Sequence, residues 1–282
     1  MEIPAHATHR PAAVADMFYP GQPATLAGDI AAMLRAAEPR PCLAPKALIV
    51  PHAGYIYSGP IAASAYASLT PLHAQIRKVV LLGPTHRVAV RGLALPESTV
   101  FDTPLGSVPV DTALERKLLE LPQVQRNEAA HALEHSIEVQ LPFLQSVLDD
   151  FTLLPLAVGM ASDGDVAEVL DLVWGGPETL IVISSDLSHY HPYAEAQRID
   201  QATARQIVAL QPLANHEQAC GATPVNGLLL CAQRRGLYPH LLDLRNSGDT
   251  AGDRARVVGY GAFAFSEASA ISETSETQEE RR

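Results

Sequence analysis

The 282-residue sequence contains no long hydrophobic run and few cysteines, and each absence excludes a class of protein. No window approaches the roughly 18 consecutive apolar residues of a membrane-spanning helix. The opening residues, MEIPAHATHRPAAVADMFYPG, lack the basic start and apolar centre of a secretory signal peptide. Three cysteines, Cys42, Cys220 and Cys231, cannot all pair, which favours a reducing compartment with free thiols. We therefore expect a soluble, cytoplasmic protein.

Basic residues are also scarce. Lys and Arg number 20 against 31 Asp and Glu, for a formal charge of -11. The electrostatic field of such a negative charge repels phosphate backbones and anionic lipid, so neither nucleic acid nor a membrane surface is an expected partner. Residues 266–282 hold several of the acids and no apolar period, and are expected to form a disordered acidic tail. With 47% hydrophobic residues and no internal linker, residues 1–265 are expected to form one domain.

Three segments share one pattern: a short continuous apolar run, a turn signal and then a histidine. The runs cover residues 47–50, 79–82 and 180–183. Unbroken β-branched and Leu runs of this length are typical of strands buried on both faces. Two further strands are expected at 151–158 and 256–265, and helices at 61–69, 111–119, 136–148, 164–173, 194–210 and 225–234. This alternation predicts a three-layer α/β/α domain with a mainly parallel central sheet.

Side chains suited to chemistry follow three of these strands. His52, His86 and the pair Asp186 and His189 each stand one to six residues beyond an expected strand end. Ligands of open α/β sheets bind in the crevice beyond the carboxyl ends of the strands. A single histidine in such a place is more often structural than a ligand, but three at equivalent positions favour a site. We therefore expect these side chains to converge.

A metal site is the chemistry that these residue types favour. Imidazole and thiolate are good ligands for late first-row metals, so His52, His86 and Cys220 form the candidate ligand set. Cys220 precedes a helix expected to begin near Pro224, and the positive end of the helix dipole is expected to lower its pKa. Asp186 and His189 are candidates for a carboxylate–imidazole pair. Alternatively, these residues merely cap the following helix, with Ser188 or Asp186 as its N-cap.

The stretch from His131 to His135 matches H-x-x-E-H, the zinc signature of inverted zincin peptidases. That function needs both histidines and Glu134 inside one long helix, whereas the match opens a predicted helix. We favour another interpretation, in which His135 and Glu138 share a helix face. His135 is then a candidate polar wall of the cleft, acting as a proton carrier or substrate contact.

Several segments in order resemble the Memo family, whose bacterial members are also called AmmeMemoRadiSam system protein B. These segments are PHAGYIYSGPIAASAY (51–66), LLGPTHR (81–87), EHSIEVQLPFLQ (134–145), SSDLSHY (184–190) and ACG (219–221). The resemblance implies a fold similar to class III extradiol dioxygenases. It also implies a metal, iron or copper, held by His52, His86 and Cys220. It places His135, Asp186 and His189 around the same cleft. The family name implies AMMECR-type and radical-SAM proteins as partners.

Three functions from different classes remain open at this point. The first is a non-haem iron- or copper-dependent redox or oxygen-activating protein, with His189 as acid/base, Asp186 orienting it and His135 polarising an oxygen atom. Cys220 stands where the dioxygenases have a carboxylate. A thiolate is a softer ligand than a carboxylate and favours copper(I) or zinc, although iron(II) is still compatible with the site. The second is a zinc hydrolase. The third is a non-catalytic module that binds a peptide or partner protein in the cleft.

Overall fold

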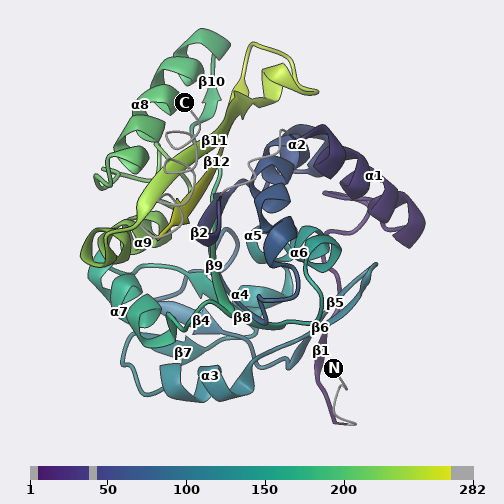
Figure 1. Ribbon diagram of the computed structural model, residues 1–282, viewed down its shortest axis with the longest axis vertical. Coiled ribbons are helices and arrows are strands. Elements are labelled where there is room, and N and C mark those ends of the chain that lie inside the picture. Colours follow the sequence, from purple (N-terminus) through teal and green to yellow (C-terminus); the bar gives the residue numbers. More distant parts are fainter. Residues whose placement is uncertain (1–5, 38–42, 268–282) are drawn as a thin grey trace, which may run out of the picture.

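The computed structural model describes residues 6–37 and 43–267 (Figure 1). Cys42 and residues 268–282, which make up nearly all of the expected acidic tail, lie outside the described residues. Ser266, the first residue assigned to that tail, is instead the buried last residue of a strand. No helix in the described ranges is both long and apolar enough to span a membrane.

A nine-stranded sheet forms the centre of the molecule. Its main path has the order β10-β12-β2-β9-β3-β8-β4-β7, and β11 pairs with β12. The strands are β2 (Pro45–Val50), β3 (Lys78–Pro84), β4 (Leu93–Leu95), β7 (Val124–Arg126), β8 (Thr152–Val158), β9 (Thr179–Ser184), β10 (His189–His191), β11 (Tyr238–Asn246) and β12 (Val257–Ser266). The four central strands β2, β9, β3 and β8 are parallel, whereas β10, β11 and β12 are antiparallel to their neighbours. The expected parallel centre is confirmed.

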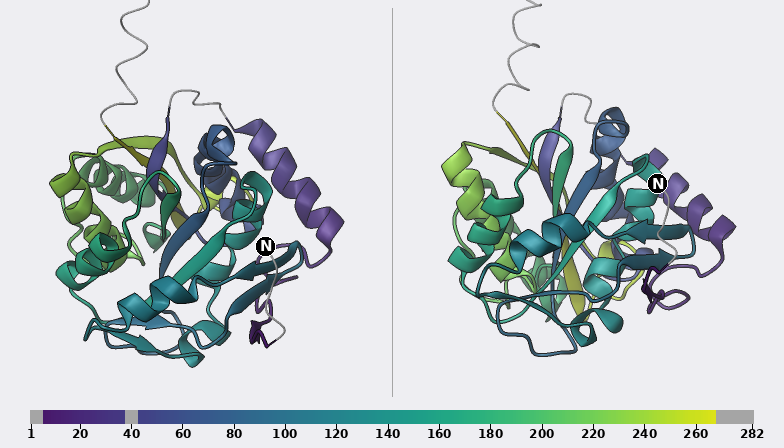
Figure 2. Two further views of the ribbon diagram at one scale, coloured as in Figure 1. Left: turned by 60° about the horizontal axis from the view of Figure 1, so that its bottom comes forward. Right: turned by 90° about the horizontal axis from the view of Figure 1, so that it is seen from below.

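Helices cover both faces of this sheet, which gives three layers (Figures 1 and 2). One hydrophobic cluster joins the sheet to α1, α2 and α6, and a second joins it to α7 and α9. The helices are α1 (Pro23–Ala36), α2 (Tyr55–Tyr66), α3 (Thr112–Leu118), α4 (Ala129–Ala132), α5 (His135–Glu138), α6 (Leu141–Val147), α7 (Asp163–Val173), α8 (Tyr193–Val208) and α9 (Ala222–Arg235), with short 3-10 helices η1 (Ala67–Leu72) and η2 (Ser247–Asp249). A small separate sheet contains β1 (His9–Arg10), β5 (Val100–Thr103) and β6 (Gly106–Pro109).

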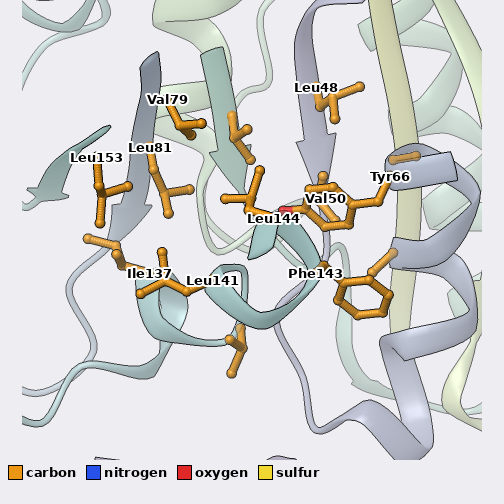
Figure 3. Close-up of a cluster of buried hydrophobic side chains, with 14 of the residues drawn as sticks. Leu48, Val50, Tyr66, Val79, Leu81, Ile137, Leu141, Phe143, Leu144 and Leu153 are labelled. Atoms are coloured by element: carbon orange, nitrogen blue, oxygen red, sulfur yellow. The ribbon is translucent and has the colours of Figure 1, made fainter. Parts of the chain in front are cut away.

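The first cluster includes α5, the helix that carries His135. Figure 3 shows Ile137 of α5 and Leu141 and Leu144 of α6 facing strand residues such as Val79 and Leu81. All five side chains are buried. Fully burying one such side chain stabilises the fold by about 1.5–3 kcal/mol. Apolar packing therefore fixes α5, which carries His135, against the sheet.

Several features of the fold differ from the expectation. The helix expected over 136–148 is interrupted between α5 and α6, where Pro142 occupies the first turn of α6 and cannot donate to the preceding turn. Helix α1 and strand β11 have no counterpart among the expected elements. Strand β10 follows Asp186 and Ser188, and the next helix, α8, has Pro192 as its N-cap. The interpretation of Ser188 or Asp186 as a helix cap is therefore wrong.

Candidate metal centre

His52, His86 and Cys220 meet in space although up to 168 residues separate them. His52 follows β2, His86 follows β3, and Cys220 precedes α9 by two residues. The parallel register pairs Val50 with Ser184, so neighbouring strands end at the same edge of the sheet. One ligand atom from each of the three residues lies within 4.8 Å of the others. Cys220 Sγ and His52 Nε2 are 3.3 Å apart.

Hydrogen bonds at Ser184 determine which nitrogen of His52 faces the cleft. The Ser184 hydroxyl donates to the Ser136 carbonyl at 2.5 Å, so its oxygen can only accept from the His52 ring. His52 Nδ1 lies 2.9 Å from this oxygen and therefore carries the proton. Gln140 donates to the same oxygen at 2.8 Å. The unprotonated Nε2 of His52 is thus left with its lone pair toward Cys220.

Glu134 determines which ring nitrogen of His86 carries the proton. Its Oε1 lies 2.8 Å from His86 Nδ1, and its Oε2 accepts from the His86 backbone N–H at 2.6 Å. The backbone N–H groups of His135 and Ser136 also donate to Oε1, both at 3.0 Å. Burial would raise the pKa of Glu134, but the bonds from His86 and Ser136 lower it to about 2. A carboxylate on Nδ1–H leaves the other ring nitrogen of His86 available to a metal.

The Cys220 thiol does not have the lowered pKa expected from the helix that follows it. Burial raises the pKa of Cys220 to about 12, and the nearby Asp186 carboxylate acts in the same direction. Desolvation of the thiolate therefore outweighs the dipole of α9. Without a cation beside it, Cys220 is a neutral thiol. Cys231 is buried within the second cluster, as expected for a small hydrophobe.

Asp186 connects two of the ligand residues. Its Oδ1 accepts from the His52 backbone N–H at 2.7 Å, and its backbone carbonyl accepts from the Cys220 N–H at 3.2 Å. Burial raises the pKa of Asp186 to about 7, against the opposing bond from His52. No hydrogen bond between described residues joins Asp186 to His189. Asp186 therefore does not form the expected carboxylate–imidazole pair with His189. It instead connects the loops that carry His52 and Cys220.

His135 and His189 lie close to the candidate ligand histidines. The ring of His135 lies 5.3 Å from that of His52 and 4.6 Å from that of His86, centroid to centroid. Burial lowers the pKa of His135 to about 4, so this side chain is neutral at pH 7. Burial also lowers the pKa of His189, which lies close enough to His52 to influence its titration. Both imidazoles can accept a proton in the cleft.

The H-x-x-E-H stretch does not form a zincin helix. His131 lies in α4 and His135 in α5, two separate single-turn helices. His131 Nε2 lies 2.8 Å from the Ala94 carbonyl, within the protein interior. Glu138 does not join His135 in the cleft either, because it forms a buried ion pair with Arg10. The two histidines of the motif therefore face different surroundings.

Sequence reasoning missed two residues that orient the ligands. Glu134 and Ser184 lie in segments that resemble the family, but nothing in the local sequence indicates that their side chains bond to His86 and His52. A second group of potential ligands, His86, Glu134 and His135, also meets the geometric requirement for a metal. Glu134 already accepts four hydrogen bonds, so a metal there would have to displace them. The group with Cys220 is the stronger candidate.

The fold and the donor set define an α/β protein with a two-histidine, one-cysteine site at the carboxyl ends of its parallel strands. A model of the family described as Memo-like protein matches residues 10–264. The chain belongs to the Memo family.

Proteins related in sequence support the same family assignment. A MEMO1 family protein from Aquifex aeolicus is 36% identical over 274 residues, which cover 91% of this chain and 98% of that protein. One from Sulfolobus acidocaldarius is 37% identical over 236 residues, which cover 77% and 81%. The crystal structure of the uncharacterized protein JW3007 from Escherichia coli K12 has a TM-score of 0.53 at 14% identity, covering 77% of this chain and 98% of that one, and shares the fold alone.

Proposed function

We propose that this protein binds one metal ion through His52, His86 and Cys220 and is a non-haem iron- or copper-dependent redox protein of the oxygen-activating kind. The observation that carries the proposal is the meeting of three ligand atoms within 4.8 Å of one another. Two imidazoles and a thiolate suit copper, iron or zinc better than magnesium or calcium.

The protonation states of the donors fit such an ion. His52 is buried, its Nδ1–H is bonded to Ser184, and its Nε2 is free to coordinate. Glu134 prepares His86 in the same way. Burial raises the pKa of Cys220 to about 12, because a buried thiolate is poorly solvated. A bound cation would lower that pKa by balancing the charge of the thiolate. Both imidazoles are thus ready to coordinate a metal, and only Cys220 must lose a proton when the metal binds.

Bound iron or copper would supply one-electron redox chemistry and oxygen activation. The residues around it would handle protons. His189 is neutral and half-buried, so it would accept a proton from a substrate and return it later. His135 would donate or accept a hydrogen bond at a polar group of the substrate. Asp186 would keep the His52 and Cys220 loops in register.

Metal identity separates this function from a zinc hydrolase, which would use the same donors with a metal-activated water. We also propose AMMECR-type and radical-SAM proteins as partners, on the strength of the family resemblance alone. A peptide- or partner-binding module remains the alternative if the metal-loaded protein shows no turnover.

The test is metal analysis of protein purified without oxygen and without a chelating tag. We expect one iron or copper per chain, with His52→Ala reducing the bound metal to background because one of three anchors is lost. His131→Ala is the matched control, since His131 lies outside the cleft, and should retain the metal. Stoichiometric zinc with hydrolytic turnover would favour the hydrolase. Full metal content in His52→Ala would remove this site from consideration.

A further inference from the structure

Tyr190 has a backbone conformation that a tyrosine rarely adopts. Its φ angle is +63°, in the left-handed region that favours glycine. It lies in β10 where the register with β12 shifts between His189 and His191. Strain of this kind persists where the surrounding structure imposes it, and it gathers at functional sites. The ring is nevertheless 62% exposed, so it is not held there to fill the core.

The ring of Tyr190 lies beside a residue of the candidate site. Its centroid is 5.7 Å from that of His189, the proposed proton carrier. Burial raises the pKa of Tyr260, and the Asp186 carboxylate raises it further. Tyr57 and Tyr190 act on Tyr260 in the same direction, so both phenols lie within electrostatic reach of one group near Asp186. An exposed aromatic surface thus adjoins the site.

A cation accompanies this ring. The Arg256 guanidinium lies 5.1 Å from the centroid of Tyr190. Arg256 is exposed, and no carboxylate or carbonyl in the described part of the chain pairs with its side chain. Its planar fork of donors matches carboxylate and phosphate oxygens, and the ring beneath limits its motion.

We infer that Tyr190 and Arg256 form an anion-binding subsite beside His189, where a carboxylate or phosphate group of a small-molecule substrate binds. The inference rests on the proposed function, because the subsite would place the reactive part of that substrate near His189. The left-handed backbone of Tyr190 directly follows His189, and the Tyr190 ring lies next to that imidazole. Arg256 provides the charge, and Tyr190 holds it in place.

The experiment titrates sodium benzoate and inorganic phosphate separately into zinc-loaded and metal-free protein and follows amide shifts by NMR. Arg256→Gln should weaken binding of the bound probe by about ten-fold or more, since a charge-assisted pair is lost. Arg254→Gln is the matched control, because Arg254 forms a similar pair with another ring, its guanidinium 4.3 Å from the centroid of Tyr193. This variant should bind the probe like wild type. Binding of benzoate alone identifies a carboxylate, and binding of phosphate alone a phosphate ester.

Tyr190→Gly separates recognition from structure. It removes the ring and relieves the backbone, so the thermal midpoint should stay level or rise while anion affinity falls. A lowered midpoint with unchanged affinity would make Tyr190 purely structural and overturn the inference. It is also overturned if neither probe binds wild type, or if both arginine variants lose affinity equally. If the wild-type protein binds the anion but does not bind zinc, only the metal site is refuted.

Discussion

Glu134→Gln offers the sharpest test of how the ligands are prepared. The change keeps the size of the side chain but replaces an acceptor-only carboxylate by an amide. Four N–H donors point at the carboxylate, from the His86 ring and from the backbone of His86, His135 and Ser136. The amide nitrogen of Gln would face some of these donors with a donor of its own. His86 would then lose its fixed orientation.

The magnitude follows from the pKa of Glu134, which falls from 4.5 to about 2. At 1.36 kcal/mol per unit this is about 3 kcal/mol in favour of the charged carboxylate, and it is fully present at pH 7. We expect Glu134→Gln to lower the free energy of unfolding by about 1–3 kcal/mol. The orientation of His86 adds a separate effect, a loss of zinc affinity of roughly 10- to 100-fold.

The assay is zinc competition with a chromophoric chelator, with urea unfolding at pH 7 as the companion measurement. Glu128→Gln is the control, because Glu128 also accepts from backbone donors, at Glu97 and Ser98, but lies away from His86. It should lose stability and keep its zinc affinity. If folded Glu134→Gln binds zinc as tightly as wild type, Glu134 does not orient His86 and the reasoning fails.

Three further outcomes are expected. His189→Ala should retain the metal but lower turnover by about 100- to 10,000-fold, measured as metal content and rate on one sample; loss of metal would make His189 a ligand. Cys220 in metal-free protein should react slowly with iodoacetamide at pH 7 and faster at high pH, because its pKa is about 12; fast alkylation at pH 7 would contradict this. The pKa of His131 is lowered by burial from 6.5 to about 4, so the unfolded chain takes up a proton first and about 3 kcal/mol of stability is lost as pH falls from 6.5 to 4. His131→Gln should flatten the fall in unfolding free energy across this window without changing metal content, and an unchanged slope would count against it.

Much of the fold was predictable from local pattern. Continuous apolar runs such as 79–82 can only be buried on both faces, which requires a covered sheet. Turn residues after each run mark the strand end, and parallel strands present those ends at one edge. The convergence of His52 and His86 follows from that geometry without any knowledge of distances. Helix α1 escaped prediction, and its N-cap residue Gln22 makes no side-chain cap hydrogen bond.

The state of each site residue was not predictable in the same way, because it depends on partners far away in the chain. Glu134 reaches His86 across 48 residues, and Asp186 reaches His52 across 134. Cys220 illustrates the limit most clearly. The helix that follows it could be read locally and favours the thiolate, whereas the burial that favours the thiol exists only once the chain has folded around it. The candidate ligand residues could therefore be predicted from residue type and strand position. Their protonation states and orientations depend on tertiary packing, because desolvation and long-range hydrogen bonds leave no pattern in the local sequence.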